Sequence, residues 1–279
     1  MRRDQAAGLR ARRKTFSSAS GSPPSMGAVG LVSGKGGVGK SMLAVNLAAA
    51  AATRSGRVLL IDGDLGLANT DLLMGLVPPY DLQDWMEGRA ALRDVVCEGP
   101  SGLSLLLTGD SECAGRALRQ ALEGGGDPAL AGLIAEQELV LVDLGAGIGA
   151  AVIELASACR PLWIVANPEP TSLADAYTTI KRLWDRNASL EIELVVNRAR
   201  DAFAGERTHH ALSRLTRRFL GRPVPLRAVI PEEPGLVRSV AEQRPLVLGS
   251  QRTTASRRLV LLAESLLEDS RPPASSVSG

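Results

Sequence analysis

Aromatic residues and cysteines are scarce in this sequence. Only 3% of its 279 residues are aromatic, so a core has to be built from Leu, Val, Ile and Ala, which suits a parallel sheet packed under helices. The three cysteines, Cys97, Cys113 and Cys159, lie far apart and form no C-x-x-C pair. Neither a zinc site nor a disulfide framework is therefore indicated, and a reducing cytoplasm is the expected compartment.

The sequence also lacks long apolar runs and a large excess of charge. The longest runs, such as Leu43 to Ala52, are too short to span a bilayer, and the N-terminus carries charge without the apolar stretch of a secretion signal. The formal net charge of +2 is too nearly balanced for the whole protein to bind nucleic acid electrostatically. We therefore expect a protein that is neither secreted nor membrane-spanning.

The composition along the chain predicts one large domain between two tails. Residues 1–25 form a basic N-terminal tail with a short helical pattern, and its second part, 15–25, has the Ser, Gly and Pro content of a flexible linker. Residues 26–268 form the domain. Residues 269–279 are polar and contain proline, so we expect them to be disordered.

Within the domain, strand-like apolar runs alternate with helical patterns. Strands are predicted at 28–33, 57–62, 103–107, 139–143, 162–166, 192–197 and 224–230, and helices at 42–54, 149–159, 173–186, 207–219 and 252–267. The last helix has Leu259, Leu262, Ala263, Leu266 and Leu267 on one face, the spacing of a helix that covers a sheet. The alternation predicts an α/β fold with a doubly wound, mostly parallel sheet flanked by helices.

The segment GKGGVGKS, from Gly34 to Ser41, carries a phosphate-binding pattern. Gly34, Gly39, Lys40 and Ser41 satisfy G-x-x-x-x-G-K-[ST], directly after a predicted strand and before a predicted helix. The glycines let backbone N–H groups point at the oxygens of a polyphosphate, assisted by the positive end of the helix. Lys40 would neutralise the β and γ phosphates, and the Ser41 hydroxyl would bind Mg²⁺. The predicted nucleotide contacts of this loop are Gly34, Lys35, Gly36, Gly37, Val38, Gly39, Lys40, Ser41 and Met42.

Two further strand ends carry carboxylates. Asp62 and Asp64 follow one apolar strand, and Asp143 follows another and is itself followed by a glycine-rich turn. Because open α/β sheets place ligands at the carboxyl ends of their strands, these side chains are expected beside the P-loop. A carboxylate after the first strand, Asp62 or Asp64, could bind Mg²⁺ through water or orient the attacking water, and Asp143 would hold the Mg²⁺ water shell; Asp62 and Asp143 are the predicted metal ligands. A turn or a helix cap is the alternative for Asp62 and Asp64.

The P-loop and its second lysine, Lys35, resemble the KGGVGK[ST] segment of the MinD/ParA ATPases. The resemblance implies slow, switch-type hydrolysis of ATP with Mg²⁺, and a nucleotide-sandwich homodimer in which Lys35 reaches the phosphates bound by the other subunit. It also implies catalytic roles for Lys35, Lys40 and Asp64. Without the resemblance, Lys35 could equally be a solvated loop charge.

The same resemblance implies roles for three residues further along the chain. Asn197, in the string VVNR, and Pro231 would lie at the adenine base, and Glu169, in NPEPTS, would touch the nucleotide of the partner subunit. From the residues alone, Asn197 could bond the base through its carboxamide or could cap a helix.

Three longer strings are similar to the FlhG/FleN group of MinD-like proteins, which regulate flagellar number and placement. They are IDGDLGLANTDLLMGL, VDLGAGIG and NPEPTSLADAYTTIK. The N-terminal DQAAGLR is similar to the helix through which FlhG proteins dock on the flagellar GTPase FlhF, so Asp4, Gln5 and Leu9 are predicted contacts. The alternative is an unstructured basic leader. A flagellar transcription activator and switch-complex proteins are further candidate partners.

One departure from the family concerns the membrane. MinD and many FlhG proteins end in an amphipathic helix that binds lipid, whereas this chain ends SRPPASSVSG, without a basic face or bulky apolar residues. We therefore expect a cytoplasmic protein with at most a transient contact with the inner face of the cell membrane or the cell pole.

The alternative function is that of a ParA-like ATPase that binds DNA for partitioning. It is suggested by six basic residues, Arg198, Arg200, Arg207, Arg214, Arg217 and Arg218. A basic helix face is usually only solvated, and no DNA-reading motif is present, so nucleic acid is not the expected partner.

Overall fold

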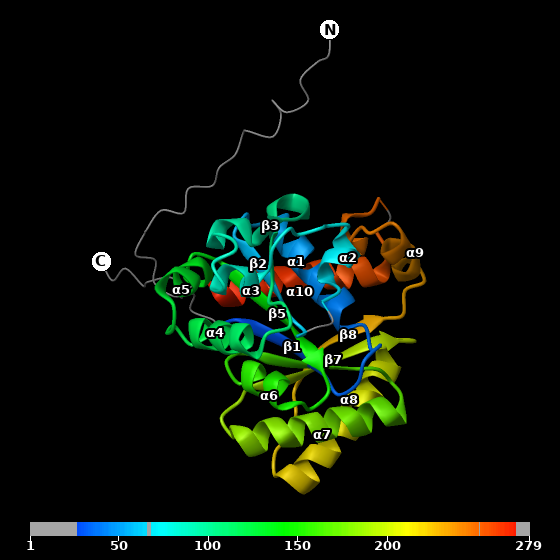
Figure 1. Ribbon diagram of the computed structural model, residues 1–279. Helices are drawn as coiled ribbons and strands as arrows, with labels where there is room; N and C mark the ends of the chain where they lie inside the picture. Colours follow the sequence, from blue (N-terminus) through cyan, green and yellow to red (C-terminus); the bar gives the residue numbers. More distant parts are fainter. Residues whose placement is uncertain (1–26, 66–67, 251, 272–279) are drawn as a thin grey trace, which may run out of the picture.

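The computed structural model describes residues 27–65, 68–250 and 252–271, which form an α/β domain built on one eight-stranded sheet (Figure 1). The predictions for residues 1–25 and 272–279, including the contacts of Asp4, Gln5 and Leu9, lie outside the described residues.

The sheet is doubly wound and mostly parallel, as the sequence predicts. Its strands are β1 (Val29–Ser33), β2 (Val58–Gly63), β3 (Val96–Glu98), β4 (Ser104–Leu107), β5 (Leu139–Ala146), β6 (Leu162–Ala166), β7 (Ile192–Ala199) and β8 (Leu226–Pro231). They lie in the order β3-β4-β2-β5-β1-β6-β7-β8, and only β3 and β4 are antiparallel. The neighbours of β1 are β5 and β6, so the loop after β1 lies at the topological switch point, where such sheets bind ligands.

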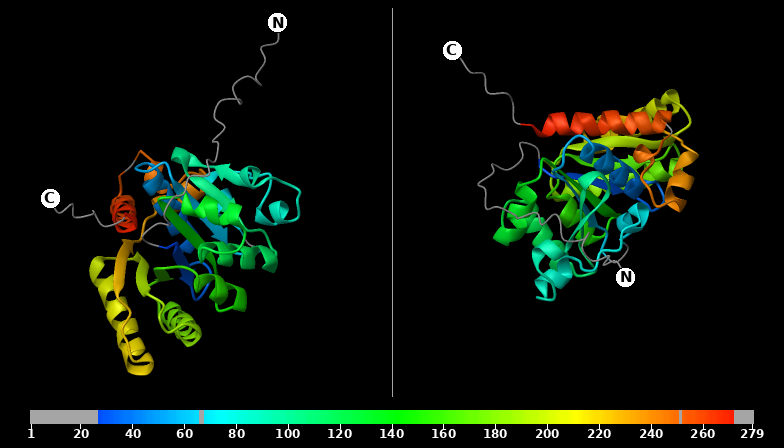
Figure 2. Two further views of the ribbon diagram at one scale, coloured as in Figure 1. Left: turned by 90° about the vertical axis from the view of Figure 1, so that its left-hand side faces the viewer. Right: turned by 90° about the horizontal axis from the view of Figure 1, so that it is seen from above.

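Helices cover both faces of the sheet. They are α1 (Lys40–Ala52), α2 (Thr70–Met74), α3 (Leu82–Met86), α4 (Glu112–Leu122), α5 (Pro128–Ala135), α6 (Ala150–Ala156), α7 (Pro170–Arg186), α8 (Ala202–Leu220), α9 (Gly235–Ala241) and α10 (Thr254–Ser270). Buried residues of α1 and α10 form one core, and those of α4 to α8 form the other. The two layers are visible above and below the sheet in Figure 1, and Figure 2 shows α10 (red) on the outside of the α1 layer.

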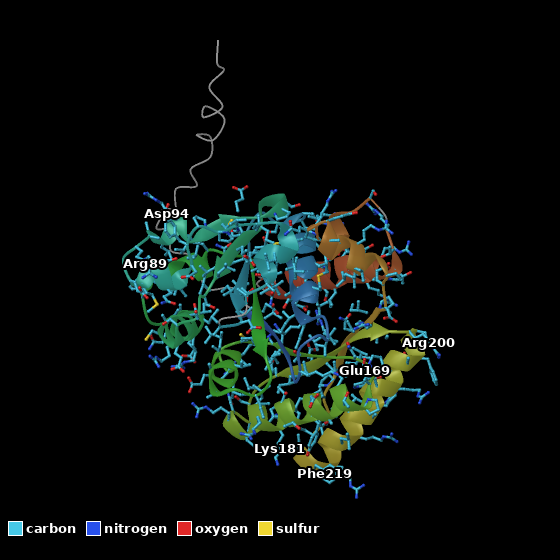
Figure 3. All side chains as sticks on the ribbon, turned by 45° about the vertical axis from the view of Figure 1, so that its right-hand side comes forward. Arg89, Asp94, Glu169, Lys181, Arg200 and Phe219 are labelled. Carbon is cyan, nitrogen blue, oxygen red and sulfur yellow. The ribbon has the colours of Figure 1, made fainter. Side chains whose placement is uncertain are left out.

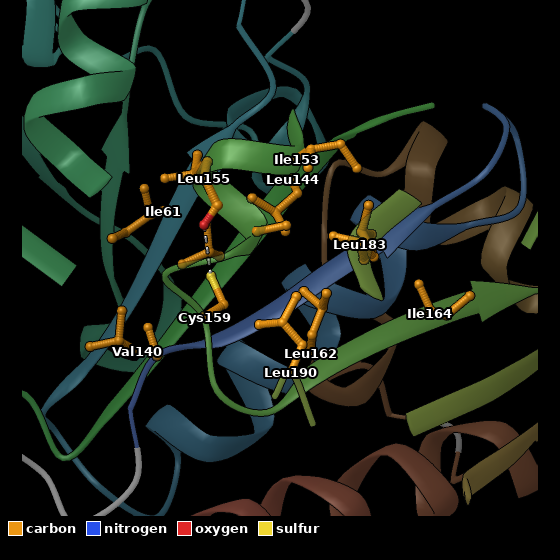
Figure 4. Packing of buried hydrophobic residues seen from close by; sticks show 14 of the residues in the cluster. Ile61, Val140, Leu144, Ile153, Leu155, Cys159, Leu162, Ile164, Leu183 and Leu190 are labelled. Atoms are coloured by element: carbon orange, nitrogen blue, oxygen red, sulfur yellow. Dashed lines mark hydrogen bonds between the residues drawn. The ribbon is translucent and has the colours of Figure 1, made fainter. Parts of the chain in front are cut away.

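The strands supply side chains to both cores in alternation. In β2, Val58 and Leu60 pack with α1, whereas Leu59 and Ile61 pack on the opposite face. Cys159 lies in this second core, where its Sγ donates a hydrogen bond to the Leu155 carbonyl at 3.6 Å (Figure 4). Burial raises the pKa of the Cys159 thiol to about 12, as expected of a structural cysteine.

Helix α10 confirms the predicted sheet cover, because the five apolar residues of its predicted face are all at most 8% exposed. The helix continues to Ser270, two residues beyond the predicted end of the domain at 268, since Arg227 binds Asp269 at 2.9 Å and Ser270 is buried. Within the described ranges, no helix is both long and apolar enough to cross a membrane.

The region between β2 and β5 holds more structure than the sequence patterns predict. Helices α2 to α5 and strand β3 were not expected there. The helices α2 and α3 have five residues each and β3 has three, too few to establish a periodicity. Local caps stabilise them instead: Asp81 and Asp84 form a capping box at α3, and the Ser111 side chain accepts from the Cys113 N–H at α4.

Candidate nucleotide-binding site

The P-loop runs from β1 into α1, as the motif predicts. Gly37 and Gly39 have φ values of 80° and 89°, a left-handed backbone that favours glycine. No protein atom lies within 4 Å of the position that a Cβ atom would take at Gly36 or Gly37. At Gly34, in contrast, a Cβ would lie 2.4 Å from the backbone of Asp175 in α7, so the start of the loop packs directly on that helix. The middle of the loop is therefore an open backbone cradle on a fixed base.

Lys40 and Asp143 meet at the base of this cradle. The Lys40 Nζ donates to Asp143 Oδ1 at 2.6 Å, and the two side chains are only 6% and 1% exposed. Burial raises the pKa of Asp143 to about 6, because desolvation outweighs the attraction of Lys40, and the Ser41 hydroxyl also bonds the carboxylate. The structure thus brings together the predicted phosphate lysine and two of the three predicted Mg²⁺ ligands.

Asp62, the third predicted Mg²⁺ ligand, lies beside Asp143 in the register of β2 and β5. Its Oδ1 accepts from the Asp64 N–H at 3.1 Å. Its Oδ2 accepts from the N–H groups of Asn69 and Thr70, each at 3.1 Å, and from the Thr70 hydroxyl at 2.7 Å. Both carboxylate oxygens therefore already have donors, and the structure shows Asp62 holding the start of α2. Its role towards Mg²⁺ stays a prediction.

Asp64 follows β2 and lies against the end of β5. Its Oδ1 is 3.0 Å from the position that a Cβ atom would take at Gly145, so any other residue there would crowd the carboxylate. Burial raises the pKa of Asp64, Lys40 lowers it, and Asp62 raises it further. The Asp64 carboxylate therefore lies near Lys40 and against the end of β5, and its role towards a water molecule stays a prediction.

Lys35 bonds residues at the start of α7. Its Nζ lies 3.1 Å from Glu169 Oε2 and 3.4 Å from Thr171 Oγ1, and the Lys35 and Glu169 side chains are 33% and 54% exposed. Figure 3 shows Glu169, the N-cap residue of α7, and Lys181, which lies further along the helix. The loop's two lysines therefore have different partners, one buried and one exposed.

Asn197 lies within β7, so the helix-cap alternative is wrong: the cap of α8 is Asp201, whose side chain accepts from the Ala204 N–H. The Asn197 Nδ2 donates to the Val38 carbonyl at 2.8 Å, which fixes the P-loop to the sheet. Pro231 ends β8, and its register partner on β7 is Ala199. Asn197 and Pro231 thus lie at neighbouring strand ends beside the loop, and their contact with a base stays a prediction.

Sequence reasoning missed two polar residues of this site. Asn167, directly after β6, donates to the carbonyls of Val38 and Asn197, each at 3.2 Å, in the amide orientation that satisfies both of its polar atoms. Thr171, in the first turn of α7, shares Lys35 with Glu169. Both residues lie in the string NPEPTS, which follows a buried strand. Asn167 could have been predicted as a site residue, because it is a polar residue at the end of that strand.

The residues present fit a nucleotide with Mg²⁺. The cradle has an open backbone at Gly36 and Gly37 and a lysine at its base, and Ser41 and Asp143 supply the oxygen donors that Mg²⁺ prefers. The N-terminus of α1 directs its free N–H groups towards the loop, and no side chain caps it.

Comparison with known proteins also indicates a nucleotide-binding domain. A profile of the CobQ/CobB/MinD/ParA nucleotide binding domain matches residues 29–246. The antiactivator FleN of Pseudomonas aeruginosa is 34% identical over 236 residues, covering 85% of this chain and 84% of that protein. The flagellum site-determining protein YlxH of Helicobacter pylori is 32% identical over 195 residues, 68% of this chain and 64% of that one. The septum site-determining protein MinD of Pyrococcus horikoshii, solved with Mg-ADP, superposes with a TM-score of 0.66 at 27% identity, covering 86% and 95% of the two chains.

Proposed function

Because the chain belongs to the CobQ/CobB/MinD/ParA nucleotide-binding family, we propose that it is a switch-type ATPase that forms a homodimer with ATP and controls flagellar number, placement and assembly.

The position of Lys35 is the observation that carries the proposal. A lysine that served only its own nucleotide would be expected to lie with Lys40, but Lys35 lies at the surface, held by Glu169 and Thr171. An exposed ion pair of this kind is worth about 0.2–1 kcal/mol, so it can be exchanged for a phosphate at little cost. A second copy facing the loop would present such phosphates to Lys35.

The remaining residues support hydrolysis within each subunit. Lys40 would move from Asp143 to the phosphates, and Ser41 and Asp143 would then hold the magnesium ion and its water shell. Bound Mg²⁺ would offset the charge that develops on the transferred phosphoryl group. Asp64 would position the attacking water, because its carboxylate lies near Lys40 and against Gly145.

The flagellar part of the proposal rests on two relatives whose names refer to an antiactivator and to flagellum site determination. The proposed partners are the flagellar GTPase FlhF, contacted through Asp4, Gln5 and Leu9, and a flagellar transcription activator or switch-complex proteins. A pull-down with the full chain and with a chain lacking residues 1–14 tests the first partner. Recovery of the GTPase by both chains would contradict a role of the tail.

Light scattering of the purified protein with ATP and with ADP tests the dimer. We expect wild-type protein to be dimeric with ATP and monomeric with ADP, and Lys35→Ala to stay monomeric with both. Lys181→Ala is the matched control, because it removes an exposed lysine of α7 away from the loop and should dimerise normally. A full ATP dimer of Lys35→Ala would refute the sandwich arrangement.

Asp64→Ala tests the assignment of the water-positioning carboxylate. The variant should bind ATP, hydrolyse it far more slowly and accumulate as a dimer, since the step that dissolves the dimer is lost. Loss of dimerisation in this variant would show instead that Asp64 is structural.

One feature of the structure is compatible with the alternative function, DNA partitioning. Arg198 and Arg200 are occupied by Glu232 and Asp201, at 3.2 and 3.1 Å. Four arginines on α8 are exposed and, among the described residues, have no carboxylate partner: Arg207, Arg214, Arg217 and Arg218. Affinity for random DNA that appears only with ATP and falls steeply with salt would favour partitioning over flagellar control.

A further inference from the structure

The hydroxyl of Thr70 makes the shortest hydrogen bond to the Asp62 carboxylate, at 2.7 Å. We propose that Thr70 is a positioning residue for ATP hydrolysis, acting through Asp62 to hold Asp64 in place. The inference rests on the proposed function, because it assigns a role in the ATPase reaction to a residue that touches neither nucleotide nor magnesium.

Asp62 joins two separate backbone positions through its two carboxylate oxygens. Its Oδ1 accepts from the Asp64 N–H, and its Oδ2 accepts from two N–H groups and the hydroxyl at the start of α2. A carboxyl group is planar and rigid, so a rotation that loosens one oxygen also moves the other. The position of the Asp64 backbone is therefore coupled to the bonds made by Thr70.

The Asp62 carboxylate is buried together with its hydroxyl donor. Asp62 is 1% exposed and Thr70 is not exposed at all, and among the described residues no lysine or arginine forms an ion pair with Asp62. A buried carboxylate without a cation depends on its hydrogen bonds for stabilisation. Loss of the hydroxyl would leave Oδ2 with two longer bonds, so the carboxylate would turn to recover a partner and would draw away from the Asp64 N–H.

The Asp64 carboxylate lies against β5 at Gly145. Its Oδ1 is 3.0 Å from the position that a Cβ atom would take there, so the carboxylate occupies space that the missing side chain leaves open. Positioning a nucleophile or a water molecule is sensitive to displacements of about 1 Å. A small turn of Asp62 is therefore sufficient to misplace the Asp64 carboxylate.

A purely structural role is the competing explanation, and the chain offers a matched control for it. The Thr108 hydroxyl donates to the backbone carbonyl of the same Asp62 at 2.8 Å, and Thr108 is 1% exposed. Thr70→Val and Thr108→Val thus each remove one buried hydroxyl bonded to Asp62 and keep the side-chain shape. Only Thr70→Val removes a donor to the carboxylate.

Steady-state ATPase kinetics of the full chain test the proposal, with thermal unfolding as a check on folding. Thr70→Val should lower kcat by about 10–100-fold with KM changed less than about twofold, as is typical when an orienting partner is lost. Thr108→Val should keep a kcat close to that of wild type, and Thr70→Ser, which retains the hydroxyl, should restore most of the rate. If Thr70→Val does not fold, Thr70→Ala makes the same comparison without a buried branched side chain.

A kcat of Thr70→Val equal to that of Thr108→Val would overturn the proposal, and so would a loss of rate that serine does not restore. In both cases an active wild-type enzyme would leave the proposed ATPase function intact. A wild-type protein that does not hydrolyse ATP would refute the proposed function itself, and the role of Thr70 with it.

Discussion

Replacing Gly34 by alanine should disturb the contact between the P-loop and α7 without removing any polar group. The new Cβ atom would lie 2.4 Å from the backbone carbon and oxygen of Asp175. Ordinary contacts begin at 3.4 Å, so the loop or the helix would have to move by about 1 Å. Because the clash is with helix backbone, no side-chain rotation can relieve it.

The expected cost follows from this overlap. Overpacking of a well-packed site destabilises a protein by about 1–3 kcal/mol. In a domain of this size each kcal/mol lowers the melting temperature by about 2–4 °C, so Gly34→Ala should unfold about 2–12 °C below wild type without nucleotide. The N-terminal end of α7 also carries Glu169 and Thr171, which hold Lys35, so the variant should lose part of its ATP-dependent dimerisation as well.

Gly36→Ala is the control, because it lies in the same loop but has open space at its Cβ position and no left-handed φ. Thermal unfolding followed by circular dichroism, without nucleotide, compares the two variants. Gly36→Ala should unfold within about 2 °C of wild type, since exposed substitutions rarely exceed 0.5 kcal/mol. Equal destabilisation by both variants would refute the reasoning, because backbone conformation and not packing on α7 would then require glycine.

Three further predictions concern single side chains. At about pH 8 a thiol reagent should label the exposed Cys113 quickly but Cys159 only after unfolding, since burial raises the pKa of the Cys159 thiol to about 12. Mass spectrometry detects the labelled residues, and labelling of Cys159 in the folded protein would contradict this prediction. The pKa of Asp143 is raised to about 6 in the folded protein, against an ordinary value of about 3.9, so the folded state binds the extra proton between these values. The free energy of unfolding of the nucleotide-free protein should therefore fall by up to about 3 kcal/mol as the pH rises through that window. Urea unfolding of wild type and of Asp143→Asn at several pH values measures this change as the difference between the two proteins. A difference that does not depend on pH would argue against the raised pKa. Asn197→Ala removes the 2.8 Å bond to the P-loop and should cost about 1 kcal/mol in the same assay, whereas unchanged stability would show that other contacts hold the loop.

The parts of the fold that the sequence predicts are those set by local patterns. The P-loop motif fixes a strand, a turn and a helix within about twenty residues, and the structure has β1, the loop and α1 there. The apolar runs of the parallel strands are equally clear, because strands buried on both faces are hydrophobic throughout. Helix α10 was predictable from the spacing of its buried leucines.

The partners of the site residues could not be predicted in the same way, since they come from distant segments. Asn197 bonds a carbonyl 159 positions earlier in the chain, and Lys35 pairs with a residue 134 positions later. The role of Asp62 towards magnesium stays a prediction, and the sequence does not show that its Oδ2 accepts from the start of α2, because a buried carboxylate takes the nearest donors. Residue type and strand position predict where the site lies, whereas the hydrogen-bond partner of each site residue depends on tertiary packing.

The two ion pairs of the P-loop differ in how easily they can be broken, and this difference gives the proposed switch an order of events. Lys40 and Asp143 are buried, so separating them without a replacement would cost several kcal/mol, about 3–5 in comparable sites. Under the proposed function, a polyphosphate that enters the cradle would compensate both charges, through Lys40 and through magnesium at Asp143. Lys35 and Glu169 are exposed, and their separation costs about 1 kcal/mol or less. Under the proposed function, nucleotide binding therefore has to precede dimerisation: the buried pair opens only for a phosphate in its own subunit, after which the exposed pair can open for a phosphate in the neighbour.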